Sequence, residues 1–172
     1  LYTLGKKAND VLKKDFEVYK NNNEIYDDLT FENVSEIAEE LMQLFLDEKY
    51  DKIVLVYNQF KNAATQIVQH EQFLPIEQFD TEEEKQLDYL FEPSKIEIVK
   101  ELIPKSLKMQ LFKALRDSFA SEHGARMTAM HKATDNAKEL RDDLKLSYNK
   151  ARQASITNEI LEIVGGAEAL NG

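Results

Sequence analysis

Few residues in this sequence have types and spacings that could do chemistry. Gly5-Lys6-Lys7-Ala8 places two lysines after a glycine, but it lacks the earlier glycine and the Ser or Thr of a phosphate-binding loop. His70, His123 and His131 show no metal-ligand spacing, so surface histidines are the better interpretation. Solvation explains the acidic run Glu82–Glu84. The sequence therefore predicts neither a nucleotide site nor a metal site.

The composition excludes further kinds of chemistry. The 172 residues include no cysteine, which removes disulfides, thiolate metal ligands and cysteine nucleophiles and suits a reducing compartment. No apolar run approaches the roughly 20 residues that a membrane span needs. Basic and aromatic residues are not interleaved as in nucleic-acid-binding proteins. We therefore expect a non-enzymatic protein without a cofactor, a membrane span or a nucleic-acid partner.

The net charge of −10 is unevenly distributed along the chain. Residues 1–104 contain 11 Lys and Arg against 23 Asp and Glu, and residues 105–152 contain 11 against 6. Residues 153–172 contain three acids and no base. A basic segment between acidic ends can steer association with charged partners, and an ordinary solvated helix face would give the same pattern.

Residues 1–103 mix strand and helix patterns, which predicts a small Rossmann-like three-layer α/β domain, incomplete at its N-terminus. Because the chain begins on Leu1 rather than Met, within a strand-like run, we expect it to be a fragment. The predicted elements are a strand at Leu1–Leu4, a helix at Lys6–Lys14, a strand at Phe16–Tyr19, a turn at Asn21–Asn23, an amphipathic helix at Asn33–Leu46, a hairpin of Ile53–Phe60 and Gln66–Phe73 with a turn at Asn62–Ala64, a loop at Asp80–Gln86, and a helix at Ser94–Ile103 opened by Pro93.

Residues 104–172 predict one long C-terminal helix, the second domain. Between Pro104 and Gly165 there is no proline and only one glycine, Gly124, and such a helix would be roughly 90 Å long. A domain of about 100 residues cannot pack it along its length, so the helix needs a partner. We expect close packing or a bend at Gly124, with the helix continuing past it.

One side of this helix carries a pattern typical of a coiled coil. The residues of this seam recur in steps of three and four, and they are Met130, Ala133, Ala137, Leu140, Leu144, Tyr148 and Ala151. Its alanines would let a partner helix approach closely, whereas the alternative is a stripe folded back onto the chain's own core. We expect the isolated fragment to self-associate through residues 126–151. Beyond Arg152, apolar residues cover more than one face, which predicts burial by another protein.

Two stretches of the long helix resemble the gamma subunit of F-type ATP synthases. They are Ser121–Met127, followed by Met130 and Ala133–Ala137, and Tyr148–Ile160, followed by Glu162–Ala167. Weaker similarities are Gly5–Lys7 after a strand, Val56–Phe60 and Glu92–Ser94, so the resemblance covers the chain in the expected order.

The resemblance implies a non-catalytic central-stalk, or rotor-shaft, subunit. In that family the terminal helices form an antiparallel coiled coil inside a ring of alpha and beta subunits, and the shaft couples ion-driven rotation of the membrane c-ring to ATP synthesis. The implied partners are the alpha, beta and epsilon subunits and the c-ring. The implied location is peripheral, at the cytoplasmic face of a bacterial cell membrane rather than at an organellar one. The family's amino-terminal helix and first strand have no counterpart in these residues.

The resemblance also implies a contact with the catalytic ring. Arg152 and Gln153 match an arginine–glutamine pair that meets loops of the catalytic subunits, and Thr157 and Glu159 match positions nearby. Arg152 and Gln153 could instead simply cap the wet part of the shaft. The competing function is a coiled-coil scaffold or adaptor unrelated to ATP synthesis, which would explain the long helix but not the Arg152–Ala167 signature. The missing catalytic groups disfavour a small α/β enzyme.

Overall fold

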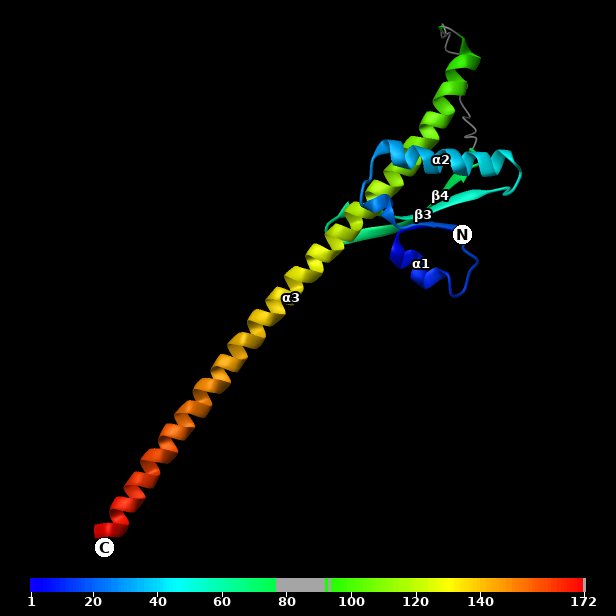
Figure 1. Cartoon of the computed structure of the whole chain (residues 1–172). Coiled ribbons are helices and arrows are strands. Elements are labelled where there is room, and N and C mark those ends of the chain that lie inside the picture. Colours follow the sequence, from blue (N-terminus) through cyan, green and yellow to red (C-terminus); the bar gives the residue numbers. More distant parts are fainter. Residues whose placement is uncertain (77–91, 93, 172) are drawn as a thin grey trace. The chain divides into compact units, whose positions relative to one another are not determined.

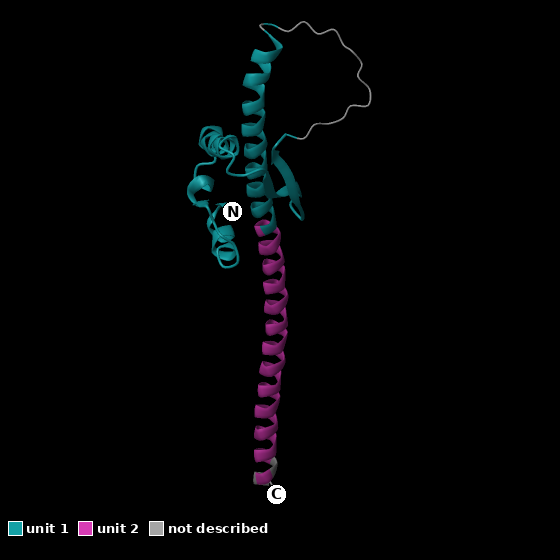
Figure 2. Cartoon of the chain, turned by 90° about the vertical axis from the view of Figure 1, so that its right-hand side faces the viewer, with its two compact units in different colours: residues 1–125 teal, residues 126–172 magenta. Residues whose placement is uncertain are grey.

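The computed structural model describes residues 1–76, 92 and 94–171, so the predicted loop at Asp80–Gln86 and Pro93 lie outside the described residues (Figure 1). The chain divides into two compact units, residues 1–125 and 126–172 (Figure 2). The elements are β1 (Tyr2–Leu4), α1 (Lys6–Leu12), β2 (Lys20–Asn22), a 3-10 turn η1 (Glu24–Tyr26), α2 (Phe31–Leu46), β3 (Ile53–Asn62), β4 (Thr65–Leu74) and α3 (Lys95–Asn171).

The α/β class and the long carboxyl-terminal helix are confirmed. The described strands form two two-stranded sheets, with β1 parallel to β2 and β3 antiparallel to β4. The predicted hairpin is confirmed with Tyr57 opposite Gln69. The division into domains at residues 1–103 and 104–172 stays a prediction, because the units defined by contacts divide the chain inside α3.

The predicted strand at Phe16–Tyr19 and the turn at Asn21–Asn23 are wrong, because β2 comprises Lys20–Asn22. Pairing with β1 overrides the weak strand preference of asparagine. Side-chain bonds also hold the asparagines in place. The Thr3 hydroxyl donates to Asn21 Oδ1 at 3.0 Å. Asn22 Oδ1 accepts from the backbone N–H groups of Glu24 and Ile25, the first two residues of η1.

The core of residues 1–125 lies between α2, α3 and the base of β4. Thr30 caps α2 by accepting the N–H of Asn33, and the predicted amphipathic pattern of this helix is confirmed. The buried core residues shared by these elements are Val34, Ile37, Ala38, Leu41 and Leu44 of α2, Phe73 and Leu74 of β4, and Leu107, Leu111 and Leu115 of α3. Residues 1–125, which we call the α/β body, are therefore built around one face of α2 and one face of α3.

The predicted end of a helix at Ile103 is wrong, because α3 begins at Lys95 and runs through Pro104. The Ser94 hydroxyl caps its start by accepting the N–H of Glu97 at 3.2 Å. Pro104 has no N–H for the carbonyl of Lys100, but Lys100 lies on an exposed turn where water can pair with that carbonyl. Two helices expected from the sequence are therefore one.

Gly124 is a point of close packing, as predicted, and α3 continues past it. A Cβ added there would lie 3.1 Å from a ring carbon of Phe60 and 3.2 Å from the Cα of Ala63. The hairpin turn therefore rests directly on the backbone of α3 within residues 1–125.

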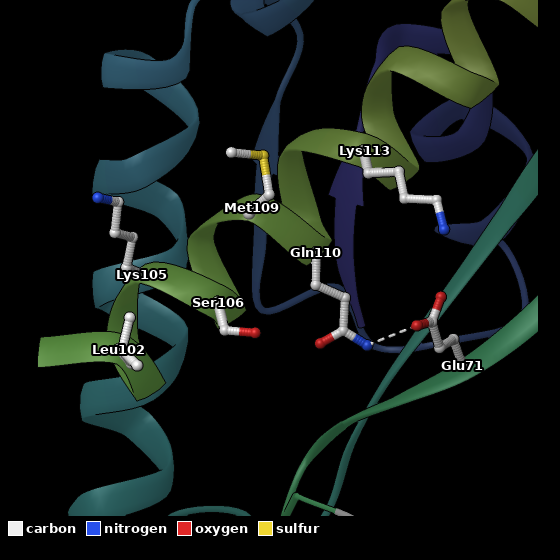
Figure 3. Close-up of a pocket in the computed structure, with 7 residues that line it drawn as sticks. All are labelled: Glu71, Leu102, Lys105, Ser106, Met109, Gln110 and Lys113. Atoms are coloured by element: carbon white, nitrogen blue, oxygen red, sulfur yellow. Dashed lines mark hydrogen bonds between the residues drawn. The ribbon is translucent and has the colours of Figure 1, made fainter. Parts of the chain in front are cut away.

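A partly buried polar network joins the hairpin to α3 beside an open groove lined by Lys105 and Lys113 (Figure 3). The Tyr57 hydroxyl donates to Glu71 Oε2 at 2.9 Å, and Gln110 Nε2 donates to Glu71 Oε1 at 2.8 Å. Burial, and then the hydrogen bond to the Glu71 carboxylate, raises the pKa of Tyr57 to about 12. The carboxylate of Glu71 thus holds together a strand and a helix.

Because the pKa of Tyr57 is raised, the free energy of unfolding should vary with pH in the alkaline range. Because an ordinary tyrosine titrates near pH 10, the stabilising effect of this phenol is complete below that pH and is lost as the pH rises toward 12. We expect Tyr57→Phe to lower the urea midpoint at neutral pH and to make the fall between pH 10 and 12 shallower. Tyr148→Phe, which removes an exposed phenol from the second compact unit, should leave the urea midpoint at neutral pH unchanged. If the urea midpoints of wild type and Tyr57→Phe fall in parallel between pH 10 and 12, this assignment is wrong.

A strained residue, Glu48, follows the end of α2, and its replacement by glycine should stabilise the fold. Glu48 has φ +55°, and the next N–H, that of Lys49, bonds back to the carbonyl of Leu44 at 3.1 Å. A left-handed conformation costs a non-glycine residue roughly 1–2 kcal/mol, and glycine adds some entropy to the unfolded chain. We expect Glu48→Gly to raise the free energy of unfolding by about 0.5–1 kcal/mol in urea titrations. Asp47→Gly, at φ −77°, is the matched control and should lower it.

Candidate partner-binding surface on α3

The predicted seam is exposed. Residues 126–171 of α3 belong to the second compact unit, and Met130, Leu140, Leu144 and Tyr148 are each more than half exposed. The three alanines of the seam are exposed as well. In the described structure none of the seven side chains is covered, so the seam is a surface available to a partner.

Helix geometry places the whole seam on one side of α3. At 3.6 residues per turn, successive side chains rotate by about 100°, so the seven residues fall within an arc of about 80°. Leu144 lies at the middle of this arc. Three alanines lie among four larger side chains along it, which lets a second helix approach closely at Ala133, Ala137 and Ala151. The arrangement is that of one half of a coiled coil.

A second apolar surface lies on the opposite side of the same helix. The sequence predicted an apolar end beyond Arg152, but not that it lies opposite the seam or that Leu146 belongs to it. Ile160 follows Leu144 by sixteen residues, which places it about 160° from the centre of the seam. We call this surface the back face; its residues are Leu146, Ile156, Ile160 and Val164, all exposed. The available signal was Leu146, which follows Leu144 by two residues and therefore cannot share its side of a helix. The apolar surface of α3 therefore changes sides near residue 150.

The four predicted ring-contact residues lie around this change, and all are exposed. The Thr157 hydroxyl donates to the backbone carbonyl of Gln153 at 2.9 Å, so these two residues share one side of the helix, within the back face. Arg152 and Glu159 lie two turns apart on a flank between the two surfaces. The guanidinium of Arg152 makes no ion pair with the side chains that the structure describes.

Within residues 1–76 and 94–171, no group of three His, Cys, Asp or Glu side chains could hold a metal ion. His123 packs its ring against that of Phe119, with centroids 4.4 Å apart, whereas His131 is exposed. Nor does this part contain a helix long and apolar enough to cross a membrane. The notable surfaces are those of α3.

Comparison with known proteins places this geometry in a family. The sequence model of a family described as ATP synthase matches residues 1–170. The chain belongs to the ATP synthase gamma-chain family. It is 90% identical over 172 residues to the ATP synthase gamma chain of Christiangramia forsetii, and 69% identical over 173 residues to that of Flavobacterium johnsoniae. Each match covers 100% of this chain and 60% of the relative, so the chain spans about three fifths of these proteins.

Solved structures show the same fold. The chain resembles a chain of the Euglena gracilis mitochondrial ATP synthase (OSCP, F1 and c-ring) with a TM-score of 0.63 and 22% identity, covering 97% of this chain and 60% of that one. It also resembles a chain of the Tetrahymena thermophila mitochondrial ATP synthase central stalk and c-ring, with a TM-score of 0.58, 24% identity, and coverage of 78% and 60%. A small sheet-and-helix domain followed by a long carboxyl-terminal helix is common to all three.

The seam predicts self-association of residues 1–172 in isolation. Leu140→Lys with Leu144→Lys would place two charges where two leucines become buried, so we expect association to weaken by at least about tenfold in sedimentation equilibrium. Leu146→Lys is the matched control, because Leu146 is as exposed as Leu140 but lies on the back face. A wild-type chain that stays monomeric, or a control that dissociates as readily as the double variant, would contradict the role of the seam.

Proposed function

We propose that the chain is part of the central-stalk subunit of an F-type ATP synthase, which couples ion-driven rotation of the membrane c-ring to ATP synthesis. The observation that carries the proposal is the 90% identity, over all 172 residues, to a protein named ATP synthase gamma chain. The gamma-chain relatives give no support to an unrelated coiled-coil scaffold. The proposed partners are the alpha and beta subunits of the catalytic ring, the epsilon subunit and the c-ring.

The two surfaces of α3 have separate tasks in this proposal. The seam packs against a second helix, because its leucines and alanines have the spacing of a coiled coil. The back face, with Ile156, Ile160 and Val164, has too few charges to remain in water, so the catalytic ring encloses it. One helix can therefore belong to a two-helix shaft and still present an apolar surface to the ring.

Arg152 and Gln153 are proposed to contact the catalytic ring, together with Thr157 and Glu159. An arginine can bridge to a carboxylate or to backbone carbonyls of one surrounding subunit at a time. Rotation would break and re-form such bonds, so their energy would differ between rotor positions. Only an interaction that differs between states can shift affinity from one nucleotide site to the next.

The subunit itself is proposed to be non-catalytic and without a cofactor. The chemistry of ATP would then take place on other subunits, and this chain would change their conformation. We also propose a peripheral position at the cytoplasmic face of a bacterial cell membrane, which fits the bacterial origin of its gamma-chain relatives. Ion transport would be a property of the whole assembly.

The test is Arg152→Ala with Gln153→Ala in the full-length gamma chain, assembled with the alpha and beta subunits. We expect ATP synthesis and hydrolysis to fall by about tenfold, the equivalent of about 1.4 kcal/mol. Assembly should survive, because the back face retains Ile156 and Ile160. Arg141→Ala is the matched control, because this exposed arginine lies on the same helix and pairs locally with Asp142 at 2.8 Å. Wild-type rates in both directions for the double variant would refute the contact.

A further inference from the structure

Two serines of α3 hold the backbone of β3 at a single residue. The N–H of Asn58 donates to Ser118 Oγ at 3.1 Å, and Ser121 Oγ donates to the carbonyl of Asn58 at 3.0 Å. Because Ser118 and Ser121 are three residues apart, both hydroxyls point from the same side of the helix. They supply the acceptor and the donor that a neighbouring strand would otherwise supply to this part of β3. We call this pair of bonds the serine clip.

The burial of Ser121 indicates that its hydroxyl is there for the bond. Its side chain is only 2% exposed, and burying a hydroxyl without a partner would cost roughly 1–3 kcal/mol. Alanine has nearly the same shape and would avoid this cost, but it would leave the Asn58 carbonyl without its donor. Packing alone would therefore favour alanine at this position.

Further contacts hold the same stretch of α3. One turn beyond the clip, Gly124 lets the hairpin backbone at Ala63 approach to a distance that a methyl group would crowd. The ring of Phe119, between the two serines, stacks on Tyr26 with centroids 6.0 Å apart. Residues 118–124 are thus held by the hairpin and by η1.

This stretch lies at the carboxyl-terminal end of the first compact unit, whose last residue is Ala125. When a rod is twisted in a hub, the load passes first through the contacts nearest the free part of the rod. Apolar contacts are non-directional, whereas a hydrogen bond weakens steeply when its angle changes. The bonds to Asn58 are therefore contacts suited to resist rotation of the helix about its own axis.

We propose that the serine clip, Ser118 and Ser121 on Asn58, is a torque joint that fixes the shaft helix in its α/β body. The proposal rests on the proposed function, because a joint matters only if the helix turns under load. Ser118 and Ser121 are positioning residues in this role. They leave the chemistry of ATP untouched and determine how stiffly body and shaft turn together.

The test uses the full-length gamma chain in the assembled complex, with the catalytic ring fixed to a surface and a bead attached to the α/β body. At a stalled position, the variance of the bead angle reports the torsional stiffness between body and ring. We expect Ser118→Ala with Ser121→Ala to raise this variance on the order of twofold, while hydrolysis without load stays at the wild-type rate. Ser118→Ala alone should give a smaller rise and spares the buried Ser121.

Ser106→Ala is the matched control, because Ser106 is an exposed serine on the same helix within the same compact unit. It should leave the variance unchanged. A second readout is amide hydrogen exchange at Asn58, which should speed up in Ser118→Ala and not in Ser106→Ala.

The outcomes separate the joint from a merely structural serine pair. If both clip variants assemble and lose thermal stability but keep the wild-type variance, the joint is wrong. An equal rise in the Ser106 control would also overturn it. A wild-type chain that does not rotate in the catalytic ring would instead overturn the proposed function, and the joint with it.

Discussion

The folding of residues 1–125 depends on the burial of one face of α3 against α2. Leu107, Leu111 and Leu115 of α3 are at most 5% exposed and meet the apolar face of α2. Neither sheet could replace this contact, because isolated two-stranded sheets are at best marginally stable in water. The strands are therefore held by the helices, through Phe73 and Leu74 in the core and through side-chain bonds at their edges.

The same constraint explains why polar contacts gather along the hairpin. A strand that lacks a neighbour has N–H and C=O groups to satisfy, and α3 offers side chains in place of a strand. Gln110 donates to the carbonyl of Gln72 near the base of the hairpin, and the serine clip holds Asn58 farther along. Between them the Glu71 carboxylate accepts from both elements. One helix is thus core partner and edge partner to the same hairpin.

Much of this fold could be predicted from the sequence where a strong local pattern agrees with the tertiary structure. The amphipathic helix at α2, the hairpin and the unbroken helix past Gly124 belong to this group. The prediction failed where weak local signals compete with distant contacts. Asparagines joined β2 because β1 pairs with them, and Pro104 stayed within α3 because its exposed turn tolerates a lost hydrogen bond.

The candidate site was predicted by a different route and only in part. The seam follows from spacing alone, whereas Arg152, Gln153, Thr157 and Glu159 came from family resemblance, because an exposed polar residue has no periodic signal of its own. The apolar end beyond Arg152 was predicted, but its position opposite the seam was not, because Leu146 stands alone on that side until Ile156. On one continuous helix, the seam and the back face fall on two separate surfaces.

The exposed apolar side chains of α3 show where this helix acts. Full burial of an exposed leucine or isoleucine contributes about 1.5–3 kcal/mol. Leu140 and Leu144 on the seam, with Ile156 and Ile160 on the back face, would together contribute about 6–12 kcal/mol once covered. That is comparable to the whole stability of a small domain, and folding of residues 1–125 uses none of it. The free energy available to residues 126–171 is therefore that of assembly, and a helix whose two apolar surfaces face opposite ways can bury both only if it is covered from two sides.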